Sequence, residues 1–123
     1  MSKLRAEDLS DAALVEGFAS VARDRGSAVL DCDPGRANKA FARMGAIVAV
    51  LRSRGKGSRM SLLPLLDDQD RLVRYYAAQH LLGIAPERAR KILEENAKFW
   101  FDPIAADARG TLHMLDNGEY KPD

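Results

Sequence analysis

Few side chains in this 123-residue sequence could bind a metal ion or act as a nucleophile. The nitrogen and sulfur candidates are His80, His113 and Cys32, and no two of them stand at the spacing of metal ligands. Cys32 lies between two aspartates, whose negative charge disfavours a reactive thiolate. We expect His80 to be partly buried and hydrogen-bonded beside the apolar stripe of its helix, and His113 to face solvent.

Two other patterns resemble ligand-binding loops only in part. The run 54–58 has the glycines and the lysine of a phosphate-binding loop, but the required strand and helix order is missing, so we interpret it as a flexible basic linker. Asp67, Asp68 and Asp70 lack the longer ligand series and final glutamate of a calcium loop, and turn and capping roles suffice for them. We therefore expect no catalytic residue, no metal and no cofactor, and a protein that is not an enzyme.

Positive charge is concentrated in the middle of the chain. Residues 34–66 contain seven Lys or Arg and no acid, whereas the segments on either side each carry a net charge of −3. Such a cluster attracts phosphates or an acidic partner. Alternatively, these side chains pair with the acidic flanking segments or are simply solvated. At 100° per residue, one helix face presents Arg36, Lys39, Arg43 and Arg54, and Lys56 and Arg59 could extend it.

Three consecutive aromatic residues, Phe99, Trp100 and Phe101, form a second candidate surface. One helix cannot bury all three on one side, so at least one is expected at the surface. It could anchor a partner or a dimer, because tryptophan is enriched at interaction hot spots. Equally, all three could cover the open end of a helical stack.

Helices must position all of these side chains. Apolar residues recur at helical spacing almost throughout, and no segment alternates as a half-buried strand does. We expect one domain over residues 1–118 and a frayed tail over 119–123. Ser10 is a predicted N-cap, and Pro86 and Pro103 occupy predicted first turns. The expected helices cover about 10–26, 36–54, 61–66, 70–82, 86–98 and 103–115, with a break at 31–35.

We interpret the start of the helix expected over 70–82 as structural. Asp70 can cap the helix, and the forked donors of Arg74 can reach the preceding acidic turn. Two small alanines allow a neighbouring helix to approach closely. The full cluster is Asp70, Val73, Arg74, Ala77, Ala78 and Leu81.

The same segment resembles a HEAT repeat, in which an acidic turn joins two helices and the second opens with a Val-Arg pair. The residues that carry this resemblance are Leu63, Leu65, Leu66, Asp67, Asp68, Asp70, Val73, Arg74, Ala77, Ala78 and Leu81. The apolar positions of the helix over 103–115 align with those of the helix over 70–82 at an offset of 31 residues, which lies within the range of helical repeats. The expected fold is an all-α, α-α superhelix of about six helices, with HEAT-like helix pairs in the C-terminal half.

Over most of its length the chain is also similar to a bacterial family of short proteins catalogued as domain of unknown function two-thousand-nineteen. The matching features are Ala37-Asn38-Lys39, Arg54-Gly55, the Val-Arg-x-x-Ala-Ala block, Ala85-Pro86-Glu87 and a last helix ending at Gly118. This resemblance implies an α-α superhelix and brings no activity, substrate or catalytic residue with it.

These observations favour a non-enzymatic interaction module that binds an unknown protein partner as a monomer or homodimer. One alternative is nucleic-acid or polyanion binding through the basic face, and another is an immunity or inhibitor protein that masks a toxin or enzyme. The longest apolar run, Ala46–Leu51, is far below the ~20 residues of a membrane span, so we expect no membrane contact. The single cysteine and the charged first residues favour a cytoplasmic protein.

Overall fold

The computed structural model describes residues 5–99 and 102–123. Within these ranges the chain forms α-helices and short 3₁₀ helices without a strand, so the predicted all-α class is confirmed. None of these helices is long and apolar enough to cross a membrane. The elements in chain order are η1 (Ala6–Asp8), α1 (Asp11–Leu30), α2 (Pro34–Arg54), α3 (Lys56–Met60), η2 (Leu63–Asp67), α4 (Arg71–Leu81), α5 (Pro86–Ala97) and α6 (Pro103–Asp116).

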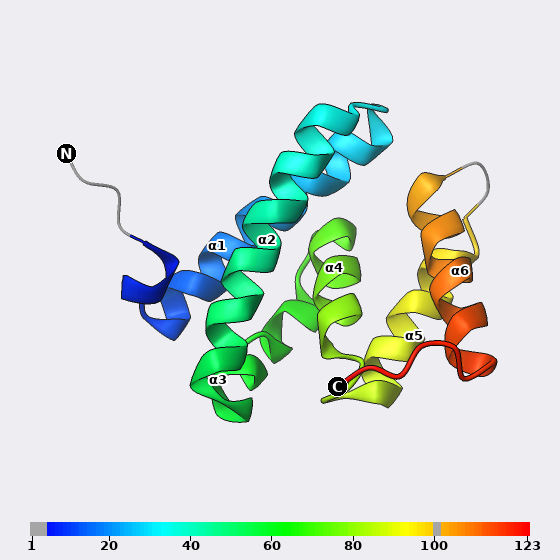
Figure 1. The fold of residues 1–123 in the computed structure, drawn as a ribbon. Coiled ribbons are helices and arrows are strands. Elements are labelled where there is room, and N and C mark those ends of the chain that lie inside the picture. The colour runs from blue at the N-terminus through cyan, green and yellow to red at the C-terminus, as the bar shows by residue number, and fades with distance from the viewer. Residues whose placement is uncertain (1–4, 100–101) are drawn as a thin grey trace.

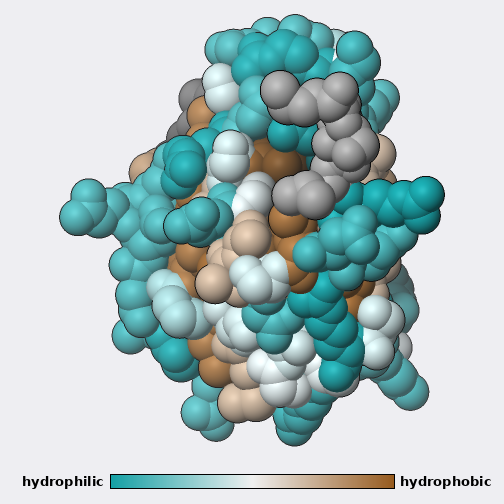
Figure 2. All heavy atoms as spheres, turned by 90° about the vertical axis from the view of Figure 1, so that its left-hand side faces the viewer, coloured by the Kyte–Doolittle hydropathy of each residue, from teal (hydrophilic) through white to brown (hydrophobic). Residues whose placement is uncertain are grey.

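The helices stack side by side as an α-α superhelix (Figure 1). α1 and α2 form an antiparallel hairpin on one side, α5 and α6 form a second pair on the other, and α4 lies between them. α1 also packs against α4 and α6, so the first helix contacts both halves of the chain. Figure 2 faces the α1–α2 side, where the surface is mostly hydrophilic and apolar side chains show only in a broken band.

Polar side chains begin most of the long helices where the sequence predicts them. Ser10 accepts a hydrogen bond from the amide of Ala13 at 3.1 Å, and Asp70 accepts one from the amide of Leu72 at 2.8 Å. α5 and α6 both begin with a proline, as expected for a residue that has no amide hydrogen to donate. The residue types at the first turn of each of these helices are therefore enough to locate where the helix starts.

The connection between α1 and α2 is shorter than the predicted break at 31–35. α1 continues through Gly26 to Leu30, and α2 starts at Pro34. Gly26 therefore does not end the helix. It allows α1 to pass close to α4, because a Cβ at this position would lie 2.6 Å from Leu72 Cδ1. Pro34 is compatible with the helix because it stands in the first turn.

The segment that we interpret as a flexible basic linker is helical. Gly55 ends α2 with φ at 112°, and α3 follows at once. Ser58 of α3 donates to Asp11 Oδ2 at 2.7 Å, which ties the segment to the start of α1. The helix expected over 61–66 is the 3₁₀ helix η2, because Pro64 interrupts the amide donors that a longer helix requires.

The cluster at the start of α4 lies in the centre of the core. Arg74 Nη1 donates to the main-chain oxygens of Asp68 and Gln69, at 2.6 and 3.0 Å, and so closes the acidic turn onto the helix. These contacts have the geometry expected of a structural arginine. The apolar members of the cluster, Val73, Ala77, Ala78 and Leu81, are all fully buried.

Residues 119–123, for which we expect a frayed tail, fold back against the helices. Gly118 turns the chain with φ at 72°, and the amides of Glu119 and Tyr120 donate to Met114 O at 2.9 and 3.2 Å. Asp123 then forms an ion pair with Arg52 of α2. An arginine of the basic middle segment therefore binds the carboxylate at the end of the tail.

Replacing Arg74 tests its structural role. Arg74→Ala leaves the carbonyls of the acidic turn without their donor, and we expect it to lower the free energy of unfolding by about 1–3 kcal/mol. The control is Arg88→Ala, which removes an ion pair with Asp67 between exposed side chains and should cost at most about 1 kcal/mol. Denaturant unfolding measures both. Equal losses would contradict the structural role of Arg74.

The contact between α1 and α4 predicts opposite effects for two glycines. Gly26→Ala places a methyl group against Leu72, so we expect a destabilisation of about 1–3 kcal/mol. Gly45→Ala in α2 meets no atom within 4 Å and should stabilise the protein by up to about 1 kcal/mol through helix propensity. Thermal melting of the two variants distinguishes these directions, and a harmless Gly26→Ala would contradict the close crossing.

Candidate functional site

A cavity of about 260 Å³ opens among α1, α2, α4 and α6. Four helices and the tail contribute to it, so residues far apart in the sequence share one surface. We call it the groove. It is lined by Arg25, Phe41, Tyr76, Gln79, His80, Asp107, Thr111 and Tyr120.

Arg25 is the principal charged group of the groove. Its guanidinium lies 4.4 Å from the centre of the Tyr76 ring and 4.8 Å from that of Phe41, so two aromatic faces hold it in place. Among the residues that the structure describes, its one hydrogen bond to a side chain is to Met44 Sδ, a weak acceptor, at 3.6 Å. Among residues 5–99 and 102–123, no carboxylate lies within ion-pair distance of Arg25. Arg25 therefore lines the groove without an ion-pair partner among the described residues.

His80 lies at the edge of the groove and is partly buried, as predicted. The hydrogen bond that we expect for its ring is not formed within the described chain. Instead the ring packs edge-on against Phe18, with centroids 5.7 Å apart. Burial lowers the pKa of His80 to about 4, and the positive charges of Arg25, Arg52 and Arg59 act in the same direction. The imidazole is thus neutral near pH 7.

A hydrogen-bond network forms the wall of the groove that α4 and α6 share. Asp107 accepts from the hydroxyl of Tyr75, and Gln79 Nε2 donates to Tyr75 at 2.8 Å and to Thr111 Oγ1 at 3.2 Å. Burial and then the hydrogen bond to Asp107 raise the pKa of Tyr75, so its hydroxyl keeps its proton and remains a donor. The network joins α4 to α6 and fixes the orientation of the polar wall.

The groups in the groove are suited to recognition. A fixed guanidinium can bind a carboxylate or phosphate through two parallel hydrogen bonds. The rings of Phe41 and Tyr120 offer apolar contact area, and the Asp107 carboxylate offers acceptors. Within the described ranges, no three His, Cys, Asp or Glu side chains gather in a way that could hold a metal ion.

The predicted basic face of α2 largely turns toward acidic residues of the N-terminal segment. Arg36 pairs with Asp24 and Asp31 at 3.2 and 3.4 Å, and Arg43 lies 4.0 Å from Asp24. Because α1 and α2 are antiparallel neighbours, the acidic and basic segments of the sequence meet along the hairpin. Three of the four predicted arginines and lysines are paired in this way, and the fourth, Lys39, is exposed.

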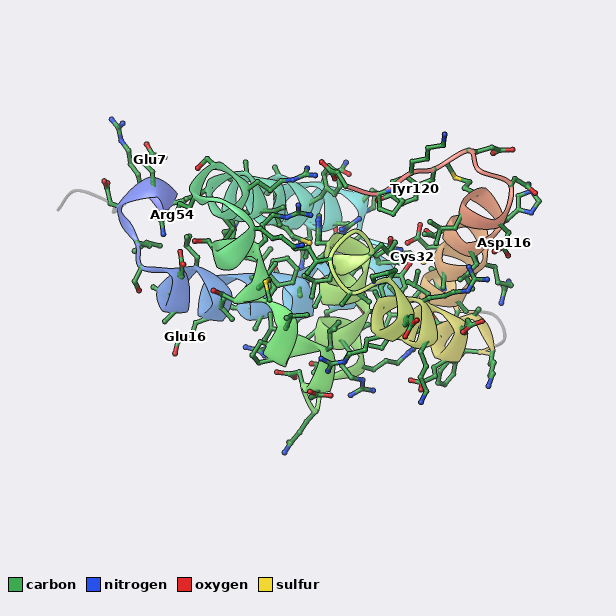
Figure 3. All side chains as sticks on the ribbon, turned by 90° about the horizontal axis from the view of Figure 1, so that it is seen from below. Glu7, Glu16, Cys32, Arg54, Asp116 and Tyr120 are labelled. Carbon is green, nitrogen blue, oxygen red and sulfur yellow. The ribbon has the colours of Figure 1, made fainter. Side chains whose placement is uncertain are left out.

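Arg54 completes this pairing at the other end of α2. Its Nη1 lies 2.8 Å from Asp11 Oδ1, and its Nη2 donates to Glu7 O at 3.0 Å. Figure 3 shows Arg54 reaching the turn that carries Glu7. Hydrogen bonds from Ser58 and then Arg54 lower the pKa of Asp11, so this carboxylate stays charged. Arg54 is therefore committed to the N-terminal end of the fold.

The aromatic run is only partly described by the structure. Phe99 is 49% exposed, and the guanidinium of Arg71 lies 4.0 Å from its ring centre. Arg71 also donates to Asn96 Oδ1 at 2.6 Å and pairs with Asp102 at 2.6 Å. Trp100 and Phe101 lie outside the described residues. Phe99 thus presents an open aromatic face backed by a paired arginine.

Sequence reasoning did not find the groove. Phe41 stands at helical spacing from the buried Met44 and Val48, so its position in the sequence indicates a buried residue, yet it is 58% exposed. Arg25 and Asp107 carry no local motif, because their role comes from neighbours on other helices. His80 is the one groove residue that the sequence singled out, through its position beside the apolar stripe of α4.

The fold and the groove define an all-α superhelical protein with an arginine-containing surface groove. The family model described as Domain of unknown function (DUF2019) matches residues 12–116, and the chain belongs to that family. No curated protein matches the chain. It is similar to the crystal structure of the protein RPA1889 from Rhodopseudomonas palustris CGA009, with 34% sequence identity, a TM-score of 0.87 and coverage of 98% of this chain and 100% of that one.

The neutral state of His80 predicts a specific dependence of stability on pH. The unfolded chain takes up a proton near pH 6.5, whereas the folded protein resists it until about pH 4. The free energy of unfolding therefore falls as the pH drops through this range, by up to about 3 kcal/mol. His80→Gln should remove this part of the slope in denaturant titrations at several pH values.

The matched control is His113→Gln, which changes an exposed histidine. It accounts for the loss of one titratable side chain without disturbing the packing against Phe18. Parallel pH profiles for the wild type and His80→Gln would show that His80 is not held neutral by the fold.

Proposed function

We propose that this protein is a non-enzymatic binding module whose groove receives an acidic segment of a partner protein. The observation that carries the proposal is Arg25, a partly buried arginine held between two aromatic rings without a carboxylate partner in the described chain. A ligand carboxylate would complete its hydrogen bonds.

The surroundings of Arg25 support a peptide segment as the ligand. Phe41 is exposed and lies beside the guanidinium, so a bound segment could cover the ring while its carboxylate meets the arginine. Aromatic and arginine side chains together are typical of interaction hot spots. The groove is open and about 260 Å³ in volume, which suits one or two side chains of an extended chain.

The other two candidate functions fit this site less directly. Polyanion binding would use the basic face of α2, but Arg36, Arg43 and Arg54 already pair with acidic residues of the N-terminal segment. An immunity or inhibitor protein would be one form of the same module, in which the acidic segment belongs to a toxin or enzyme. The exposed ring of Phe99 offers a separate surface for a partner.

Affinity capture with matched variants tests the groove. The wild type, Arg25→Ala, Phe41→Ala and Phe99→Ala are each used as bait in lysate of the native cell, and bound proteins are quantified by mass spectrometry. We expect a partner enriched by the wild type to fall about tenfold or more with Arg25→Ala and with Phe41→Ala. It should be retained by Phe99→Ala, which changes an aromatic residue of similar exposure outside the groove.

The melting temperature of each bait confirms that it is folded before capture. Because Phe41 is largely exposed, its replacement should change stability little. A partner that is lost with Phe99→Ala but retained by the two groove variants would overturn the proposal and assign binding to the Phe99 surface. Enrichment of the same protein with its tag alone would exclude it as a partner.

A further inference from the structure

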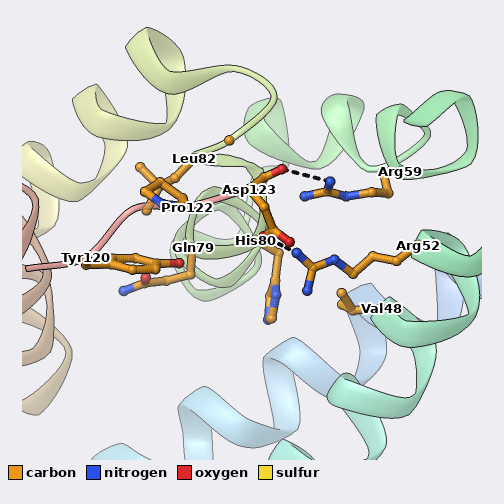
Figure 4. A pocket seen from close by; sticks show the side chains of 10 residues that line it. Val48, Arg52, Arg59, Gln79, His80, Leu82, Tyr120, Pro122 and Asp123 are labelled. Atoms are coloured by element: carbon orange, nitrogen blue, oxygen red, sulfur yellow. Dashed lines mark hydrogen bonds and ion pairs between the residues drawn. The ribbon is translucent and has the colours of Figure 1, made fainter. Parts of the chain in front are cut away.

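A second, smaller cavity of about 60 Å³ continues the groove toward the other end of α4. Gln79, His80 and Tyr120 line both cavities, so the two form one continuous depression. The end of the smaller cavity is formed by Arg52 of α2 and Arg59 of α3 (Figure 4). His80 therefore lies near three arginines, Arg25 in the groove and Arg52 and Arg59 in the smaller cavity.

The tail of the chain forms part of the wall of this second cavity, which is lined by Tyr120, Pro122 and Asp123. Asp123 forms an ion pair with Arg52, and its main-chain oxygen accepts a hydrogen bond from Arg59 Nη1 at 2.9 Å. Position 83 must be glycine for this contact, because a Cβ there would overlap the main chain of Asp123. Tyr120 lies over the boundary between the two cavities. Figure 4 shows the tail passing between α4 and the arginines.

Asp123 brings the one carboxylate among the described residues that line this cavity. The charges of Arg52 and Arg59, with that of Arg25, are close enough to disfavour protonation of His80. Without the tail, the end of the groove would carry two unpaired guanidinium groups beside a neutral histidine. A site of this charge is complementary to a carboxylate.

We propose that Arg52 and Arg59 form a second carboxylate-binding site for an acidic, extended segment of a partner protein, and that the chain's own tail fills this site until the partner displaces it. The identity of the occupant as a partner segment rests on the proposed function. The carboxylate-binding site itself does not, because the structure already shows Asp123, at the end of the tail, bound to Arg52 and Arg59 in cis.

The tail is held in a way that permits exchange. The Asp123 side chain is 80% exposed and that of Arg52 is 42% exposed, and ion pairs with so much solvent access contribute little to stability. After Tyr120, whose amide donates to Met114 O, residues 121–123 form no helix or turn. Tethering keeps the local concentration of the tail high, so an external segment must exceed that concentration to compete.

A peptide with the sequence of residues 117–123 tests the site in trans. The peptide is fluorescently labelled at its N-terminus and amidated at its C-terminus, so that only side-chain carboxylates remain, and binding to full-length protein is followed by anisotropy. Asp123→Lys in the protein repels the tail from Arg52 and Arg59 and leaves the site intact. We expect this variant to bind the peptide at least about tenfold more tightly than the wild type.

Three controls isolate the site. Glu119→Lys makes the same change of charge at a tail residue that does not line the cavity, and it should bind the peptide as the wild type does. Adding Arg52→Ala and Arg59→Ala to Asp123→Lys should abolish binding. A peptide whose last aspartate is replaced by asparagine should bind Asp123→Lys about tenfold more weakly, because the side-chain carboxylate is lost.

The results separate this proposal from the proposed function. Peptide binding that needs Arg52 and Arg59 but survives Arg25→Ala supports the second site even if affinity capture finds no partner at the groove. Equal binding by Asp123→Lys and the wild type would overturn the proposal. So would binding that persists without Arg52 and Arg59, or that ignores the replacement of the peptide's last aspartate.

Discussion

Close packing around α4 is the constraint on which the rest of the structure depends. The helix is covered by α1 on one side and by α5 on another, and six of its eleven residues are buried. The neighbouring helices can approach α4 this closely because the residues at the contacts are small. They are Ala77 and Ala78 on α4, and Gly26 where α1 crosses Leu72. Arg74 then closes the acidic turn onto the first turn of the helix.

The burial of α4 also determines where polar chemistry can occur. Tyr75, Gln79 and His80 stand on a helix with little access to water, so their polar atoms must be satisfied by neighbours or face a cavity. Tyr75 and Gln79 bond to α6, whereas His80 packs on Phe18 and borders both cavities. The groove is thus the side of α4 that its neighbours leave uncovered. Its position follows from helix packing and not from any motif.

Charge pairing adds a second level of organisation. The acidic N-terminal segment neutralises Arg36 and Arg54 of α2, and the tail neutralises Arg52. Arg25 differs because it is on α1, faces the groove and is stacked between rings. A nearly neutral protein therefore keeps one arginine available where aromatic surface is also exposed. In the proposed exchange Arg52 becomes available as well when the tail leaves, and the two cavities would then act as parts of one binding surface.

The sequence by itself determined most of the long helices and the starts of α1, α4, α5 and α6. Helical spacing of apolar residues, capping by Ser10 and Asp70, and first-turn prolines are local features, so the all-α class and the structural cluster on α4 could be predicted from them. These properties depend on residues within about one turn of each other.

Only the tertiary structure decided which charges meet and which apolar residues stay exposed. Apolar periodicity identifies the inner face of a helix, but it does not say how far a neighbouring helix extends along that face, so the exposure of Phe41 could not be predicted. The pairing of Asp123 with Arg52 joins the tail to α2, which lies far from it in the sequence. The groove depends on such long-range contacts, because Arg25, Tyr76 and Asp107 come from three different helices.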